Sequence, residues 1–225
     1  MPICQPTGSP NFTQIVDKTI ALFAIYTGAT LSFFVKDFLF SDNNLKTIHG
    51  LYGWSHYWGS WVVLAVVALL LRYIVGSAAH LNHTYIPKQK ISTVTINGNE
   101  ITRIVTDDTT YKSKSLCLLF VDLLFLIVFG ILVVFITRAT DSVSVLMWNA
   151  ILFIAAGFIW SALALFRTNQ RAIAQKWLLV DGVQILFTVG IIYLLSDELA
   201  QAVILGILYL IFLFADLYFI VRWTS

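Results

Sequence analysis

The sequence has few charges, few cysteines and little that would suit a water-soluble domain. Only 12% of its 225 residues are charged, whereas 59% are hydrophobic and the mean hydropathy is +0.84. This balance excludes an ordinary soluble globular protein and is typical of a polytopic membrane protein. The only cysteines are Cys4 and Cys117, so neither a disulfide framework nor a cysteine metal site is expected. The small net charge of +2 gives no reason to expect a nucleic-acid partner.

The motifs of several membrane enzymes are also missing. The chain has no HExxH zinc motif, no GxSxG nucleophile elbow and no Walker A loop. Its four histidines do not offer two ligands at one depth on different spans, as a haem held between helices requires. We therefore predict no cofactor and no metal site, and the sequence favours a protein that is not an enzyme.

Long apolar runs make up most of the chain. The clearest is Leu116–Thr137, twenty-two residues with one charge, which is long enough to cross a bilayer as a helix. Similar runs predict six transmembrane helices in three hairpins, with Asp141 or Ser142 capping the fourth and residues 196–198 capping the sixth. The predicted spans are Thr19–Phe40, Leu51–Gly76, Leu116–Thr137, Val143–Phe166, Trp177–Leu195 and Leu199–Val221.

One long polar segment, Ser77–Ser115, separates the second span from the third. Within it, alternating β-branched and polar residues flank Asn97-Gly98, a strong β-hairpin signal. We expect strands near Ile91–Ile96 and Asn99–Thr106. The chain then divides into an N-terminal tail with two helices (1–76), a polar segment with a small β-hairpin (77–115), and four further helices (116–225).

Lys and Arg residues are unevenly distributed between the two ends of the predicted spans. Eleven of the fourteen fall on the side that holds both termini and the hairpin. By the positive-inside rule this side is cytoplasmic, so we predict an N-in/C-in protein of a bacterial inner membrane or a plasma membrane.

Charged residues recur at that same side of the membrane. Odd-numbered spans begin near an Asp that follows a Val, and even-numbered spans end near an Arg. Gln184 lies one turn beyond the Asp of the fifth span, on nearly the same face. The candidate charge cluster therefore comprises Asp17, Asp122, Asp181, Asp216, Arg72, Arg167, Arg222 and Gln184.

Two interpretations of this cluster stay open. Asp and Arg can pair and fix helix packing, as charged groups inside membrane proteins commonly do. Alternatively, the carboxylates form an acidic cytoplasmic-side vestibule that attracts a cation or relays protons.

A second group of residues opens the second predicted span. Trp54, Trp58 and Trp61 share one helical face, with His56 among them. An interfacial aromatic belt is the simpler interpretation, and an aromatic-lined outer mouth is the alternative.

Together these patterns favour a channel or transporter-like protein of the bilayer, acting on a cation or proton, which we expect to form a homo-oligomer. The alternative, from a different class, is a non-catalytic membrane subunit that anchors or assembles a larger membrane complex.

Overall fold

The structure is a computed structural model and describes residues 10–39, 57–85, 89–96, 99–106, 116–138, 142–166 and 171–224. Within these residues six helices are long and apolar enough to cross a membrane. This confirms the prediction of six membrane-spanning helices. They are α1 (Pro10–Leu39), α4 (Trp58–Tyr85), α5 (Leu116–Arg138), α6 (Val143–Leu165), α7 (Arg171–Leu194) and α8 (Glu198–Thr224).

Two of the helix starts are fixed by side-chain caps. Ser142 precedes α6 with extended backbone, and its hydroxyl accepts a hydrogen bond from the Val145 N–H. Asp197 precedes α8, and its carboxylate accepts from the Ala200 N–H at 2.8 Å. Both bonds satisfy an N–H group that has no partner within the first helical turn. Capping at these two turns was predicted from the sequence and is confirmed.

The second span differs from the prediction at its C-terminal end. We expected it to end near Gly76, but α4 continues to Tyr85. Arg72 therefore lies near the middle of α4, about 20 Å from either end, and not at the end of a span. Residues 77–85 belong to this helix and not to the polar segment. The helix continues because its last two turns bury His80 and Tyr85 against α5, as described below.

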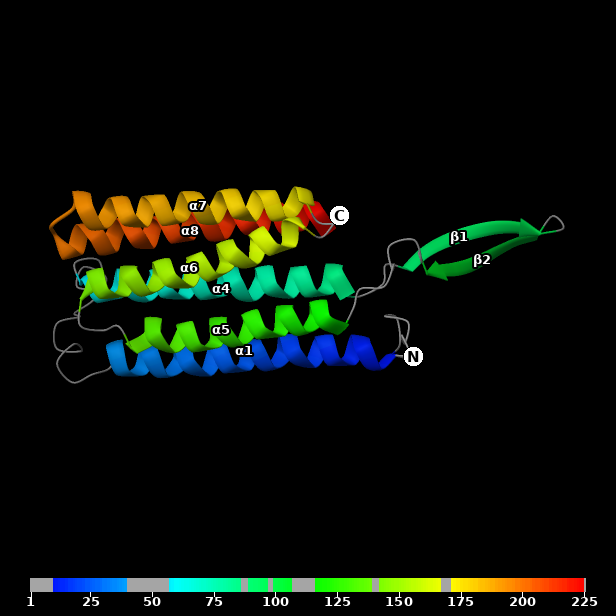
Figure 1. Cartoon of the computed structure of the whole chain (residues 1–225), viewed down its shortest axis with the longest axis horizontal. Coiled ribbons are helices and arrows are strands. Elements are labelled where there is room, and N and C mark those ends of the chain that lie inside the picture. The colour runs from blue at the N-terminus through cyan, green and yellow to red at the C-terminus, as the bar shows by residue number, and fades with distance from the viewer. Residues whose placement is uncertain are drawn as a thin grey trace.

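Two strands follow α4 in the chain. β1 (Gln89–Ile96) pairs antiparallel with β2 (Asn99–Thr106), with Gln89 opposite Thr106 and Ile96 opposite Asn99. The pair lies at the end of the bundle where α4 ends and α5 begins (Figure 1).

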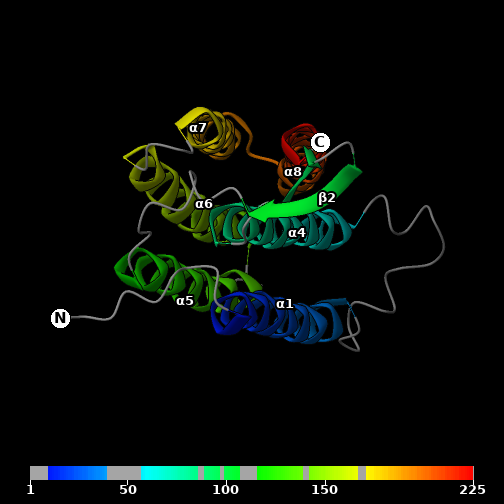
Figure 2. The same ribbon diagram turned by 90° about the vertical axis from the view of Figure 1, so that its right-hand side faces the viewer.

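The six helices form two columns of three, which are seen end-on in Figure 2. One column consists of α1, α4 and α8, and the other of α5, α6 and α7. Helices pack most extensively within a column, above all α4 with α8 and α6 with α7. By contrast, α7 and α8 make few contacts although they are neighbours in the sequence. We call the interface between the two columns the seam.

Close packing within the first column depends on a small residue of α8. A Cβ atom at Gly206 would lie 3.1 Å from both the carbonyl oxygen and a ring carbon of Trp61. Glycine thus lets the backbones of α4 and α8 approach each other closely, as small residues do between membrane helices. The outward faces carry exposed apolar side chains, among them Leu22, Phe120 and Leu186, which fit a surface in contact with lipid.

Large aromatic side chains fill the seam. Tyr73 of α4 packs edge-on against Phe153 of α6, with ring centres 4.5 Å apart, and lies 5.2 Å from the ring of Phe129 on α5. Phe129 also contacts Trp160 on α6. Among these buried rings lie the polar groups that form the candidate site.

Candidate functional site

Arg72 binds polar side chains from two other helices. Its Nη2 atom donates to Asp181 Oδ1 on α7 at 2.6 Å, and its Nε atom donates to Asp216 Oδ2 on α8 at 2.5 Å. Its Nη1 atom donates to Oε1 of Gln184, also on α7. The side chains of Arg72, Asp181 and Asp216 are at most 5% exposed. Because α7 and α8 make few contacts with each other, Arg72 is a bridge between them. We call these four residues the Arg72 cluster.

The Arg72 cluster is not balanced in charge. With all groups in their usual ionised forms, one guanidinium faces two carboxylates, which leaves a net charge of −1. Two buried polar atoms of the cluster, Asp216 Oδ1 and Gln184 Nε2, have no hydrogen-bond partner among the described residues. An uncompensated charge inside a membrane protein costs several kcal/mol. The cluster therefore favours the uptake of one more positive charge, as a proton or as a cation.

Tyr73 connects the Arg72 cluster to the aromatic packing of the seam. Its hydroxyl donates to Asp181 Oδ1 at 3.3 Å. Gly157 on α6 leaves room for this hydroxyl, because a Cβ atom there would collide with the end of the Tyr73 ring. The glycine of one column and the tyrosine of the other thus fit together across the seam.

A second buried carboxylate, Asp122 on α5, has its own set of partners. Its Oδ1 accepts from the Trp160 indole N–H at 2.8 Å, and its Oδ2 accepts from the Tyr85 hydroxyl at 2.5 Å. The Nε2 atom of His80 lies 3.5 Å from Oδ2. His80 and Tyr85 both come from the last two turns of α4, so Asp122 holds the end of that helix against the second column.

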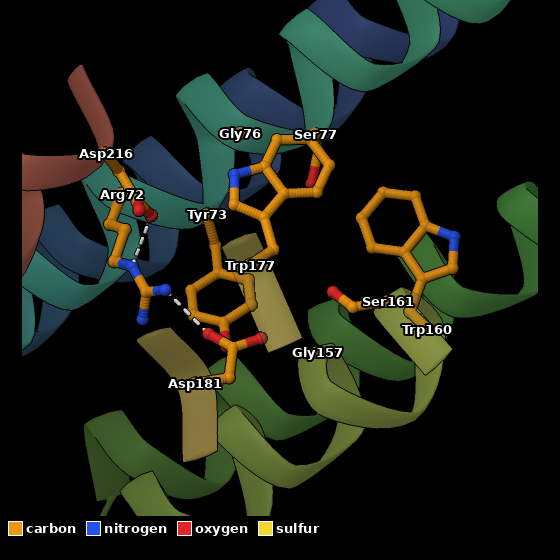
Figure 3. A pocket seen from close by; sticks show the side chains of 10 residues that line it. All are labelled: Arg72, Tyr73, Gly76, Ser77, Gly157, Trp160, Ser161, Trp177, Asp181 and Asp216. Atoms are coloured by element: carbon orange, nitrogen blue, oxygen red, sulfur yellow. Dashed lines mark hydrogen bonds and ion pairs between the residues drawn. The ribbon is translucent and has the colours of Figure 1, made fainter. Parts of the chain in front are cut away.

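A cavity of about 30 Å³ lies in the seam beside the Arg72 cluster, and Figure 3 shows the side chains around it. The first column contributes part of the wall, and α6 and α7 contribute the rest. The lining residues are Arg72, Tyr73, Gly76, Ser77, Gly157, Trp160, Ser161, Trp177, Asp181 and Asp216. Trp160 lines the cavity and also donates a hydrogen bond to Asp122, so it connects Asp122 with the cavity beside the Arg72 cluster.

No group of three His, Cys, Asp or Glu side chains that could hold a metal ion occurs in the part of the chain that the structure describes. No family model, curated protein or solved structure matches this chain.

The predicted charge cluster is divided by the structure into three groups. Arg72, Asp181, Asp216 and Gln184 lie together, and Asp122 is buried nearby with other partners. Asp17 and Arg222 are exposed, and the Arg222 guanidinium lies 5.0 Å from the centre of the Tyr218 ring. Arg167 lies outside the described residues. Asp181 and Asp216 both line the cavity, whereas Asp122 is not among its lining residues.

The structure describes two of the three tryptophans of the predicted outer mouth, Trp58 and Trp61. Trp61 is half-buried against α8 at Gly206, which makes it a packing residue of the first column. Trp58 is also half-buried, with its ring 5.9 Å from that of Tyr57. Trp54 and His56 lie outside the described residues.

Sequence reasoning missed the neutral partners of the carboxylates. Tyr73, Tyr85 and Trp160 each donate a hydrogen bond to an Asp, yet in the sequence each is one aromatic among many. Tyr73 directly follows Arg72, and this adjacency was the one available signal. His80, whose Nε2 atom lies 3.5 Å from Asp122 Oδ2, was not among the predicted site residues either.

Proposed function

We propose that this integral membrane protein is a transporter-like protein that moves protons or a small cation, with the Arg72 cluster as the site that takes up and releases the positive charge. The observation that supports this most strongly is the pair of carboxylates buried in the seam with a single guanidinium between them. A purely structural ion pair needs only one carboxylate per arginine. When Arg72 compensates one of the two carboxylates, the charge of the other costs free energy inside the membrane unless a further positive charge binds to it.

A transporter must expose its site to each side of the membrane in turn, and the two-column arrangement would allow this by movement of one column against the other. Each column packs well internally, while the seam holds the cavity and most of the polar bonds between helices. Arg72 and Tyr73 bind Asp181 across the seam, and Tyr209 of α8 lies 3.2 Å from Thr188 of α7, oxygen to oxygen. Rocking of one column against the other would exchange these few bonds, and packed layers move in this way in hinge and shear transitions.

The orientation of the protein in the membrane is also part of the proposal. Arg72 lies in the middle of α4, so it no longer counts as a residue of one side of the membrane. Of the other thirteen Lys and Arg residues, ten lie on the side that holds the termini. The bias still favours cytoplasmic termini in a bacterial inner or plasma membrane. The start of α1 and the end of α8 lie at the same end of the bundle in Figure 1. Labelling of single cysteines introduced near each end, from either side of the membrane, tests this orientation.

Flux measurements with the purified full chain in liposomes test the transport proposal. A potassium gradient with valinomycin drives proton entry, and an enclosed pH-sensitive dye reports it. We expect flux in the wild type, and a loss of about tenfold or more in Asp181→Asn and Asp216→Asn. Asp122→Asn tests whether Asp122, which is buried outside the Arg72 cluster, is also on the transport route. Asp17→Asn is the matched control, because Asp17 is an exposed acid outside the cluster.

Two results would end this proposal. The first is normal flux in both cluster variants, with normal folding by circular dichroism and gel filtration. The second is the absence of both proton and small-cation flux in the wild type, which would favour the other function class, a non-catalytic subunit of a larger membrane complex. Native mass spectrometry after mild extraction then distinguishes a homo-oligomer, which we propose for the transporter, from a fixed complex with other subunits.

A further inference from the structure

The seam cavity has the size and the walls of a site for a small ion. Its volume of about 30 Å³ is enough for one or two water-sized occupants. It is lined by side chains of both columns, and its polar lining residues Ser77, Ser161, Asp181 and Asp216 are all buried. An occupant would therefore be bound mainly by these side chains.

One polar group of the wall lacks a partner. The hydroxyl of Ser77 is buried and has no hydrogen bond to any described residue. A buried hydroxyl without a partner costs free energy, so its placement at the cavity points to an occupant that completes its bonding. Ser161, which is 5% exposed, supplies a second hydroxyl from the opposite column.

The charge of the surroundings determines the sign of that occupant. Asp181 and Asp216 both line the cavity, and Arg72 compensates only one of them. The remaining negative charge attracts a cation and repels an anion of the same size. Three aromatic side chains, Tyr73, Trp160 and Trp177, complete the lining, and aromatic rings around an ammonium group are a common recognition environment.

We propose that the seam cavity binds one water-sized monovalent cation, and that ammonium is the occupant that its walls fit best. The lining has five oxygen-bearing side chains, Tyr73, Ser77, Ser161, Asp181 and Asp216, which can accept hydrogen bonds from the N–H donors of ammonium. A divalent metal ion would find only two carboxylates and would usually keep several waters, for which this cavity has no room.

This inference rests on the proposed function and specifies the exchange at its site. The cation and a proton neutralise the same negative charge, so they compete. When ammonium enters the protonated site, the carboxyl group releases its proton and the net charge of the occupied cluster is unchanged. The titratable groups that face the cavity and the cluster are Arg72 and Tyr73 from α4, Asp181 from α7, and Asp216 and Tyr209 from α8. Ammonium binding should therefore weaken as the pH is lowered.

Thermal unfolding of the purified full chain in detergent, followed by tryptophan fluorescence, tests the site. Ammonium, sodium and choline chlorides are compared at one ionic strength. We expect ammonium to raise the unfolding temperature above its value in sodium and in choline. We also expect no such rise in Ser161→Leu, which fills the cavity, or in Asp216→Asn, which removes the excess negative charge. Ser32→Leu, the same change on the exposed face of α1, should keep the full response.

A milder pair of variants covers the case in which Ser161→Leu does not fold. Ser77→Ala and Ser161→Ala each remove one hydroxyl and should weaken the apparent affinity for ammonium about tenfold. Equal unfolding temperatures in all three salts would overturn the site, as would a larger effect of sodium or an unchanged response in Asp216→Asn. Proton flux in liposomes without any ammonium effect would overturn the site and leave the proposed function standing. An ammonium effect in a protein without flux would support the site and overturn the transport proposal.

Discussion

Replacing Arg72 with methionine tests the charge balance of the seam directly. Methionine keeps much of the aliphatic length of arginine but removes the donors to Asp181, Asp216 and Gln184. Two carboxylates then lie in the bundle without a compensating charge. Because both are nearly inaccessible to solvent, water cannot replace the lost hydrogen bonds.

The expected cost of Arg72→Met is about 4 kcal/mol at pH 7, and two estimates agree on it. Removing one partner of a buried ion pair costs about 3–5 kcal/mol. Alternatively, the uncompensated group takes up a proton, and holding neutral an aspartic acid whose pKa in water is about 3.9 costs about 4 kcal/mol at pH 7. The second cost falls by about 1.4 kcal/mol per pH unit, because the unfolded chain then binds the same proton more readily. At pH 5 the loss should therefore be about 1–2 kcal/mol.

Unfolding by sodium dodecyl sulfate in mixed micelles, followed by tryptophan fluorescence, measures this loss. The triple variant Arg72→Met/Asp181→Asn/Asp216→Asn removes all three charges and should recover at least half of the lost stability. Lys18→Met is the control, because it removes an exposed cation from α1. A loss below about 1 kcal/mol at pH 7 would refute the reasoning, as would a loss that does not shrink at pH 5.

The same unfolding measurement checks three smaller predictions. Gly157→Ala should cost about 1–3 kcal/mol because the added methyl displaces Tyr73. Gly190→Ala, with open space around its Cβ, should cost almost nothing, and equal losses at the two glycines would contradict the fit across the seam. Trp160→Phe removes the donor to Asp122 and should cost about 1–3 kcal/mol, more than Trp148→Phe on the exposed face of the same helix. Ser142→Ala should cost about 1 kcal/mol through loss of the α6 cap, whereas Ser142→Thr should be close to the wild type, and similar values for both would argue against the cap.

The spans could be predicted because membrane insertion depends on local composition. Runs of about twenty apolar residues need no information on tertiary contacts, and the helix starts at Ser142 and Asp197 carry recognisable caps. The end of α4 was missed because Gly76-Ser77 resembles a helix stop. In the folded chain, bonding of the two following turns to Asp122 favours a longer helix.

The partners in the candidate site could not be predicted for a different reason. The depth of each Asp follows from its position in a span, but its partner depends on which helices lie side by side. Pairing within the three predicted hairpins is the natural assumption, yet α4 packs most extensively on α8, and α7 packs most extensively on α6. Gly206 and Gly157 permit the close approaches that set this arrangement, and neither belongs to a GxxxG pair.

The position of Arg72 also has a consequence for biosynthesis. Its acceptors follow it in the chain by 109 residues for Asp181 and 144 for Asp216. When α4 leaves the ribosome, neither acceptor has been made, and a guanidinium at the centre of a membrane helix costs about 2.5–3.5 kcal/mol on insertion scales. The long apolar run on both sides of it offsets this cost. Stable assembly of the bundle must therefore wait for the last helix, so a nascent chain that stops before α8 would hold a membrane-buried arginine with only part of its bonding.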